Sequence, residues 1–574
     1  MRNQELSKIF YEIAEFLEVD GVPFKPYAYQ KAALSLENLK EDVFDIYRKG
    51  GNKALREIPG VGENIANHIE EYLKSGKIKI YDQYKKKLPL KIDELTRVEG
   101  LGPKKIKVLY QKLGIKNLKD LEKAIKNHKI APLFGFGEKT EKNILQGIEF
   151  QKQNKGRFLL GQILPIAEDI LENLKKLKEV EKISIAGSLR RRKETIGDVD
   201  ILVVSKKPQK VMDYFSSLDS VEKIWAKGKT KTSVHTKGGF DMDLRVVPEE
   251  SYGSALQYFT GSKDHNIITR KIAIEKGLKL SEYGLFKGSK MIAGKTEEEV
   301  YKALGLPYIE PELRENEGEI EAGLNKKLPA IIELKDIKGD LHCHSNWDGG
   351  ENSIEEMAKS AMDMGYEYIG ISDHTKFLRI ENGLDEKQLL KQHEAIKKLN
   401  LKFKIQNSGF RILHGCETNI LNNGEVDIKN EVLEKLDYVI AGVHSNLKMP
   451  KAEMTKRLVA AIKNPNIDII SHPTGRLIDR REEYQLDFDK VLEVAKQTGT
   501  ILEINSAPER LDLKDLYIRR AKEFGIKMII NTDSHQSSQL DLMRYGVFQA
   551  RRGWAEKSNI INTLPLGEIV KQFK

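Results

Sequence analysis

The spacing of hydrophobic residues changes along the chain. Over residues 1–150 apolar residues recur at helical spacing between small glycine turns, which predicts an all-helical region. A strand ending at Ala186 and a second over Val199–Val204 then flank a polar loop. Residues 316–335 are charged and predict a linker with a short helix. From residue 336 to the end, seven short β-rich runs alternate with helical segments, which favours a parallel (β/α)7-type barrel.

One element recurs within the helical region. The segments IPGVGENIANHI (58–69), VEGLGPKKIKVLY (98–110) and, more loosely, LFGFGEKTEKNIL (133–145) each place a Gly-apolar-Gly turn before a helix. Such glycines bring backbone N–H groups and the positive helix end close to a phosphate; the clearest are Gly60, Gly62, Gly100 and Gly102. One copy more often makes only a tight turn, but three favour binding to a nucleic-acid backbone. The motif resembles the helix-hairpin-helix of DNA repair proteins.

The charge distribution agrees with a polyanionic partner. Residues 1–320 carry 58 Lys and Arg against 48 Asp and Glu, whereas residues 321–574 carry 38 of each. The whole net charge of +10 therefore lies in the first part. Charge alone does not decide, because many lysine-rich proteins bind no nucleic acid. The composition, 40% hydrophobic and 32% charged, excludes a disordered or collagen-like chain.

The sequence contains no sign of export. No stretch approaches 18 uncharged apolar residues, and the first residues form an amphipathic helix pattern carrying acids, unlike a signal peptide. The only cysteines, Cys343 and Cys416, are too few for a disulfide framework, and we interpret them as small packing residues. We expect a cytoplasmic protein without a membrane segment.

The loop after Ala186 has the chemistry of a nucleotide site. Gly187 and Ser188 follow the strand, and Arg190–Arg192 come next, so close backbone approach and guanidinium forks suit a polyphosphate. Asp198 and Asp200 lie two apart on the next strand and face one side. The segment GGFDMDLRVVP offers Asp241 and Asp243 on another strand. Converging carboxylates repel one another unless cations hold them, as in two-metal phosphoryl transfer. Each acid alone would be a turn or solvated residue; the order of the whole set favours the site.

The run GS-LRR-x5-GDVDIL, followed by DMDLRVVP and YFTGSKDHN, resembles the nucleotidyltransferase palm and thumb of family X DNA polymerases, from the first residues to about 315. The resemblance implies that Asp198, Asp200 and Asp243 hold two Mg²⁺ ions and that Asp243 helps to activate the primer 3′-hydroxyl. It also implies that the nucleotide triphosphate is bound by Gly187, Ser188, Arg191 and Gly197. It assigns Tyr258, Phe259 and Gly261 to the sugar, where they would disfavour a 2′-hydroxyl. It places Asn266 and Arg270 along the base and the template strand.

Five positions depart from or match the family in an informative way. His68 stands where the polymerase beta branch has its Schiff-base lysine, and Asn64 replaces a nearby lysine. A neutral imidazole cannot form the imine, so deoxyribose-phosphate lyase activity is not expected. Lys25 and Tyr29 match positions that hold a 5′-phosphate, which implies gap recognition. Lys263 replaces an acidic residue near the nucleotide base, so the family's base-pair contacts are not expected there.

Nearly every predicted barrel strand ends in a metal-type ligand. These residues are His342, His344, His374, Glu417, His444, His472, Asp533 and His535. Strand C-termini of a barrel open on one face, so these residues converge there, and imidazole with carboxylate suits Zn²⁺, Mn²⁺ or Fe²⁺. A single strand-end histidine is more often a core residue, but six of the eight histidines after residue 320 end predicted strands. We expect no catalytic role for His393, in a charged helix, or for His414, which points away.

This constellation resembles the polymerase and histidinol phosphatase (PHP) domain over 336–574. The resemblance implies two to three Mn²⁺ or Zn²⁺ ions on these eight residues, and Asp348 of the Trp347-Asp348-Gly349 turn as a further ligand. It also suggests that Arg476, in HPTGR, holds a scissile phosphate. The implied chemistry is metal-dependent hydrolysis of a phosphodiester, as a 3′-to-5′ exonuclease.

Together the resemblances imply a domain order and a function. The expected domains are an N-terminal helical domain (1–90), a fingers-like helical domain (91–150), palm (151–245), thumb (246–315), linker (316–335) and PHP barrel (336–574). We expect a monomeric, nucleoid-associated repair enzyme that takes gapped or nicked DNA and deoxynucleoside triphosphates. Two alternatives remain: a nucleotidyltransferase whose PHP domain is a small-molecule phosphatase or pyrophosphatase, and a non-catalytic DNA-end-binding scaffold. The complete acid triad and nearly complete ligand set argue against the scaffold.

Overall fold

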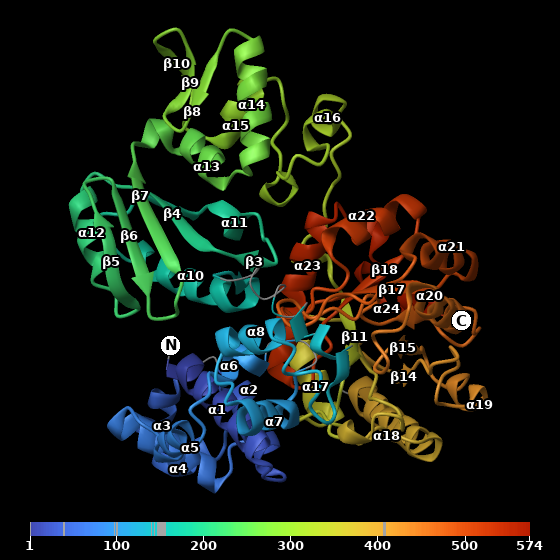
Figure 1. Ribbon diagram of the computed structural model, residues 1–574. Coiled ribbons are helices and arrows are strands. Elements are labelled where there is room, and N and C mark those ends of the chain that lie inside the picture. The colour runs from blue at the N-terminus through green and yellow to red at the C-terminus, as the bar shows by residue number, and fades with distance from the viewer. Residues whose placement is uncertain are drawn as a thin grey trace. The chain divides into compact units, whose positions relative to one another are not determined.

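The computed structural model describes residues 2–37, 39, 41–96, 98, 101–138, 140–142, 144–145, 148, 156–405 and 409–573. The chain forms two compact units, drawn together in Figure 1. One comprises Met1–Lys155 with Leu477–Glu483, and the other comprises Gly156–Arg476 with Tyr484–Lys574. From Gly156 onward, the predicted palm, thumb, linker and barrel therefore belong to a single unit, apart from Leu477–Glu483.

The first unit is helical, as predicted, and its described residues contain no strand. Its helices include α1 (Arg2–Asp20), α2 (Lys25–Glu37), α3 (Val43–Leu55), α4 (Glu63–Ser75), α5 (Lys79–Lys87), α6 (Ile92–Thr96), α7 (Pro103–Leu113) and α8 (Leu118–Lys126). They enclose two apolar cores. Helix α1 joins the cores, because it places Phe10 in the first and Phe16 in the second.

The predicted palm is a five-stranded sheet in the order β2-β4-β7-β6-β5. Its strands are β2 (Lys182–Ile185), β4 (Asp198–Val204), β5 (Val221–Lys227), β6 (Lys231–Thr236) and β7 (Asp241–Val247), with a small β1 (Phe158–Leu159) and β3 (Thr195–Ile196) pair beside them. The helices are α10 (Leu160–Lys175), α11 (Gly187–Arg190) and α12 (Pro208–Ser216). Strands β4 and β7 run parallel at the centre, and the other pairs are antiparallel. The central strands thus share one direction, which fixes the register of their acids.

The predicted thumb begins beyond β7. It contains α13 (Tyr252–Thr260), α14 (Lys263–Glu275), a sheet of β8 (Lys279–Ser281), β9 (Gly284–Lys287) and β10 (Lys290–Ala293), and α15 (Glu297–Ala303). The predicted linker does contain a short helix, α16 (Glu319–Leu324), but that helix packs on the thumb. Glu319 is fully buried and lies 2.6 Å from His265, whose other ring nitrogen lies 2.8 Å from the Tyr301 hydroxyl. Residues 316–335 are therefore part of the fold.

The C-terminal region is the predicted barrel. Parallel strands β11 (Gly339–Cys343), β12 (Tyr368–Ile371) and β13 (Arg411–His414) form one sheet. Strands β14 (Glu417–Asn419), β15 (Ile440–Gly442), β16 (Ile469–Ile470), β17 (Ile501–Asn505) and β18 (Met528–Asn531) form the other. Bridges between Cys343 and Ser534, and between His374 and Glu417, join the two sheets into a ring. The predicted run 411–420 supplies both β13 and β14, so seven chain segments build the ring.

Helices surround the barrel strands (Figure 1). They are α17 (Ile354–Asp363), α18 (Glu386–Ile405), α19 (Asn430–Leu433), α20 (Lys451–Ile462), α21 (Phe488–Thr498), α22 (Asp515–Phe524), α23 (Met543–Arg552) and α24 (Leu566–Ile569). One buried cluster takes an apolar residue from each of seven strands: Leu341, Tyr368, Leu413, Ile440, Ile469, Ile501 and Ile529. Both cysteines are buried within apolar clusters, as the packing interpretation predicts. Within the described residues, no helix combines the length and the apolar character needed to span a bilayer.

Candidate functional site

The three palm acids meet on one face of the central strands. Asp200 on β4 lies directly opposite Asp243 on β7, and Asp198 lies two residues earlier on β4. Burial, followed by the Asp198 and Asp243 carboxylates, raises the pKa of Asp200 to about 7. The Lys231 ammonium lies 2.6 Å from Asp243 and is one of the cations that face this cluster. The site therefore gathers the carboxylates that a divalent cation would stabilise.

Asp241, the other acid of the DMD segment, has different partners. Its carboxylate accepts hydrogen bonds from Trp225 Nε1 at 2.9 Å and from His235 Nδ1 at 2.7 Å. Those residues come from the edge strand β5 and from its neighbour β6. Asp243 is thus the member of the pair that completes the triad, in agreement with the sequence prediction.

The predicted nucleotide loop lies against the triad. Gly187 has a φ of 62°, and a Cβ at this position would lie 2.5 Å from Asp200 Oδ2, so only glycine fits here. Ser188 follows within the short helix α11. Arg191 donates to the Thr260 carbonyl and lies 3.1 Å from Glu315. Arg190, by contrast, forms a buried ion pair with Glu297 and is structural.

The predicted sugar and base contacts lie at the junction of α13 and α14. The rings of Tyr258 and Phe259 meet edge to face with centroids 5.1 Å apart, and Gly261 ends α13 with a φ of 72°. The Asn266 amide donates to the Tyr258 carbonyl at 2.7 Å and accepts from Gln257 at 2.8 Å. Arg270 Nε donates to the Asn266 carbonyl at 3.0 Å. Asn266 and Arg270 therefore stabilise the Tyr258–Gly261 segment in this structure.

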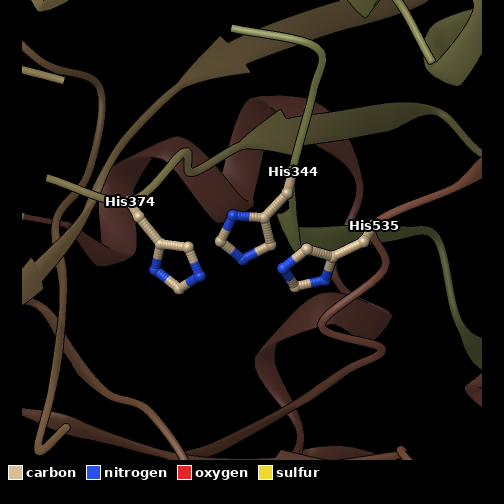
Figure 2. A group of neighbouring side chains, drawn as sticks. All are labelled: His344, His374 and His535. Atoms are coloured by element: carbon tan, nitrogen blue, oxygen red, sulfur yellow. The ribbon is translucent and has the colours of Figure 1, made fainter. Parts of the chain in front are cut away.

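The barrel ligands converge at the strand ends. His344 lies at the centre, with its ring centroid 4.2 Å from those of both His374 and His535 (Figure 2). Among the described residues, four groups have ligand atoms within 4.8 Å of one another: His344, His374 and His535; His342, His344 and Asp533; His374, Glu417 and His444; and His344, Asp348 and Asp373. His472 joins them through its Nε2, 3.1 Å from Glu417 Oε1. All eight predicted ligands are therefore brought together.

The donor set fits divalent cations. Five buried atoms of these side chains form no hydrogen bond with any described residue: His342 Nε2, His344 Nε2, His374 Nδ1, Glu417 Oε2 and His472 Nδ1. Buried polar atoms in native proteins almost always have a partner, so this cluster of imidazole and carboxylate atoms fits divalent cations. His472 and Asp533 also have φ values of 27° and 57°, in the left-handed region that functional residues often occupy.

Further residues hold the barrel ligands in place. Glu503 lies 2.6 Å from His342 Nδ1, and Asn419 accepts from His444 Nδ1 at 2.7 Å. Asp348 Oδ2 lies 2.9 Å from His344 Nδ1 and accepts from the His374 backbone at 2.8 Å. The sequence analysis did not single out Glu503 or Asn419. The available signal was a polar side chain inside an otherwise apolar barrel strand, because such a group needs a partner.

Arg476, the predicted phosphate contact of the barrel, has partners in two parts of the fold. Its guanidinium forms a two-point ion pair with Glu194 of the palm, at 2.6 and 3.1 Å, and donates to the Leu511 carbonyl. The carboxylate balances the charge of Arg476 in this structure, and the predicted phosphate contact stays a prediction. His414 is buried and lies 3.0 Å from both His393 and Gln392, which agrees with a structural role for this pair.

The predicted DNA-contacting residues of the first unit lie at helix starts and in one aromatic contact. Gly62 and Gly102 begin α4 and α7 with no side-chain cap, and no atom lies within 4 Å of a Cβ built on either. Gly60, with a φ of 71°, packs instead against Lys31. Lys25 is exposed, whereas the buried Tyr29 hydroxyl lies 2.9 Å from His68 Nδ1. Gly100 lies outside the described residues.

Comparison with known proteins covers nearly the whole chain. Family models match in chain order: a helix-hairpin-helix domain (1–78), a SAM-like helix-hairpin-helix tandem (92–149), the DNA polymerase beta palm (163–236), the DNA polymerase beta thumb (255–315) and the PHP domain (340–507). The DNA polymerase/3′-5′ exonuclease PolX of Bacillus subtilis (strain 168) is 38% identical over 574 residues, 99% of each chain. The chain belongs to the family X DNA polymerases with a PHP domain.

Shorter relatives match less than half of this family X chain. A probable phosphatase of Thermoanaerobacter sp. (strain X514) is 30% identical over 246 residues, which is 41% of this chain and 94% of that protein. A probable phosphatase of Acetivibrio thermocellus is 29% identical over 211 residues, 35% of this chain and 80% of that protein. The family models confirm the fold class inferred from the sequence. The individual site residues stay predictions.

Proposed function

We propose that this chain is a template-directed, gap-filling DNA polymerase whose PHP barrel is a metal-dependent 3′-to-5′ exonuclease. The observation that carries the proposal is the presence of two separate acid or imidazole clusters in one family X chain. The full-length relative named DNA polymerase/3′-5′ exonuclease supports both activities. The substrates would be gapped or nicked DNA and deoxynucleoside triphosphates, and the enzyme would act as a monomer on the nucleoid in the cytoplasm.

In the palm, Asp198, Asp200 and Asp243 would hold two Mg²⁺ ions. When bound, these ions would lower the pKa of the primer 3′-hydroxyl and neutralise the charge of the pyrophosphate. Gly187 lets the nucleotide loop approach Asp200 without a steric clash. Arg191, held by Thr260 and Glu315, would meet the triphosphate beside Ser188 and Gly197. Tyr258, Phe259 and Gly261 would bound the sugar.

In the barrel, the eight strand-end residues and Asp348 would hold two or three Mn²⁺ or Zn²⁺ ions, which supply Lewis acidity for phosphodiester hydrolysis. Glu503 and Asn419 each accept the Nδ1 proton of a histidine, His342 and His444. The Nε2 lone pairs of these rings therefore point at Glu417, at 3.4 and 3.3 Å. The protein thus fixes both the tautomer and the direction of these ligands.

In the first unit, the turns at Gly62 and Gly102 would let a DNA phosphate approach the N–H groups of α4 and α7. The open space beside both glycines supports this role. Lys25 would contribute a cation to a 5′-phosphate at the gap, with Tyr29 supporting the helix behind it.

A gapped duplex with a 5′-phosphate and Mn²⁺, with and without deoxynucleotides, tests both activities in the full-length protein. We expect Asp198→Ala with Asp200→Ala to abolish extension and to leave shortening intact. His342→Ala with His344→Ala should have the opposite effect. Extension by the palm variant, or shortening at an unaltered rate by the barrel variant, would overturn the corresponding assignment.

A second function for the barrel is supported by its shorter relatives, which are named probable phosphatases. In that case the barrel would release inorganic phosphate from a small substrate such as pyrophosphate. Parallel assays of 3′-labelled DNA and pyrophosphate separate the two, because the nuclease assignment requires loss of the label that depends on His342 and His344.

A further inference from the structure

A cavity is lined by chain segments that follow three of the barrel ligands. Its volume is about 400 Å³, within the range of small-molecule sites, and its walls are Phe377, Leu421, Asn422, Asn423, Ser445 and Asn446. Each wall segment directly follows a predicted metal ligand. Phe377 comes three residues after His374, Leu421 four after Glu417, and Ser445 immediately after His444. The ligand atoms of those three residues lie within 4.8 Å of one another, so the three wall segments all continue from one ligand group.

The walls of the cavity are held firmly by two charged residues. The Asp427 carboxylate accepts hydrogen bonds from the Phe377 backbone at 2.9 Å and from the Thr375 hydroxyl at 2.7 Å. The buried Arg457 donates to the carbonyls of Leu421 at 3.0 Å and Ser445 at 2.8 Å. The three wall segments are thus tied to the barrel, which indicates a preformed site.

The chemistry of the lining matches a nucleobase. Phe377 is 45% exposed, so a ring face is available for stacking. The Asn446 amide donates to the Asn422 carbonyl at 2.8 Å, and no other described group bonds these two side-chain amides. The NH₂ of Asn422 and the carbonyl of Asn446 can therefore serve as donor and acceptor for a base edge. Aromatic stacking tolerates every base, as an exonuclease requires.

We infer that this cavity takes the 3′-terminal nucleobase of the DNA strand being trimmed, stacked on Phe377, while the scissile phosphate lies at the His374, Glu417 and His444 group. The inference rests on the proposed nuclease function and adds to it the subsite that holds the departing nucleotide. Because the site engages the base itself, a strand whose terminal nucleotide lacks a base should lose this contribution.

The test uses the full-length protein with Mn²⁺ and two single-stranded oligonucleotides, one with an ordinary 3′-terminal nucleotide and one with an abasic terminal nucleotide. Base stacking on an aromatic ring predicts that Phe377→Ala lowers kcat/KM on the ordinary strand by about 5- to 140-fold. Phe377→Tyr should restore it, and Ile380→Ala, an 88% exposed residue outside the cavity, should match the wild type. On the abasic strand, the wild type and Phe377→Ala should be equal. Equal losses on both strands, or no loss on either, would overturn the inference.

A binding measurement separates failure of this subsite from failure of the nuclease. Calorimetric titration with dAMP and with 2-deoxyribose 5-phosphate measures the contribution of the base directly. We expect the wild type to prefer dAMP, and Phe377→Ala to lose most of that preference. If the wild type shortens no DNA, the nuclease proposal fails. If Phe377→Ala keeps the wild-type preference for dAMP, the subsite inference fails, whatever the result of the nuclease assay.

Discussion

Glu503 and His342 form a buried pair in the barrel, with the Glu503 carboxylate 2.6 Å from His342 Nδ1. The other Glu503 oxygen accepts from the His472 backbone N–H at 2.7 Å. Burial alone would raise the pKa of Glu503, but the His342 ring lowers it below its usual value, so the carboxylate remains charged. One acid thereby positions two predicted ligands that are 130 residues apart in the sequence.

Glu503→Gln should therefore weaken the barrel cluster. Removing a partner that orients a ligand typically reduces metal affinity by about 10- to 100-fold. Titration with Mn²⁺, followed by electron paramagnetic resonance, measures this affinity. Glu493→Gln, at an exposed acid on α21, is the matched control and should leave it unchanged. Wild-type affinity in Glu503→Gln would show that the pair is only a packing contact.

Cation binding in the palm should depend on pH. Burial and the neighbouring carboxylates raise the pKa of Asp200 to about 7, so the group carries a proton at pH 6 and loses it by pH 8. A cation must displace that proton, so its apparent affinity should rise about tenfold over this interval. Mn²⁺ titration of the His342→Ala, His344→Ala variant isolates the palm site. Asp198→Asn removes a like charge beside Asp200, so the rise in Mn²⁺ affinity should occur at lower pH. An affinity that does not change between pH 6 and pH 8 in the palm site would show that Asp200 protonation does not compete with the cation.

The Arg476 and Glu194 pair should stabilise the contact between palm and barrel. Arg476→Met removes the cation beside the Glu194 carboxylate, which is 24% exposed and keeps the Gln549 amide as a partner, at a cost of up to about 3 kcal/mol in the free energy of unfolding. For a unit of this size, that corresponds to a fall of roughly 3 °C in melting temperature. The double variant Arg476→Met, Glu194→Gln should recover part of the loss. An unchanged melting temperature with a reduced nuclease rate would instead support the phosphate-binding role.

The Tyr29 and His68 contact bears on lyase chemistry. Burial lowers the pKa of His68, so its ring is neutral at physiological pH, and an imidazole cannot form an imine with a sugar aldehyde. Incubation with DNA carrying a 5′-deoxyribose phosphate, followed by borohydride reduction, should give no trapped adduct with the wild type. A trapped adduct that maps to the first unit would contradict this expectation.

Much of the architecture could be predicted because it depends on local patterns. Strand-end histidines and the i, i+2 acid pair Asp198 and Asp200 are visible in the sequence, and barrel geometry brings the former to one face. The segments around Asp200 and Asp243 both alternate polar and apolar residues, which predicts two strands of one sheet. In the structure these strands pair with Asp200 opposite Asp243.

Contacts between distant segments could not be predicted in the same way. Arg476 pairs with Glu194 across 282 positions, and His265 pairs with Glu319 inside a segment whose charge suggested a linker. Neither pair leaves a local pattern, because each depends on how whole elements pack. Glu503 was hidden for a related reason: in a single sequence, an acid within an apolar strand does not reveal which ligand it holds.

The central claim is that folding gathers two separate clusters, each able to hold divalent cations. Anomalous diffraction from crystals of the full-length protein grown with Mn²⁺ tests it most directly. The structure predicts peaks beside Asp198, Asp200 and Asp243, and two or three peaks among His342, His344, Glu417 and Asp533. Well-ordered side chains at both places without an anomalous peak at one of them would contradict the claim for that site.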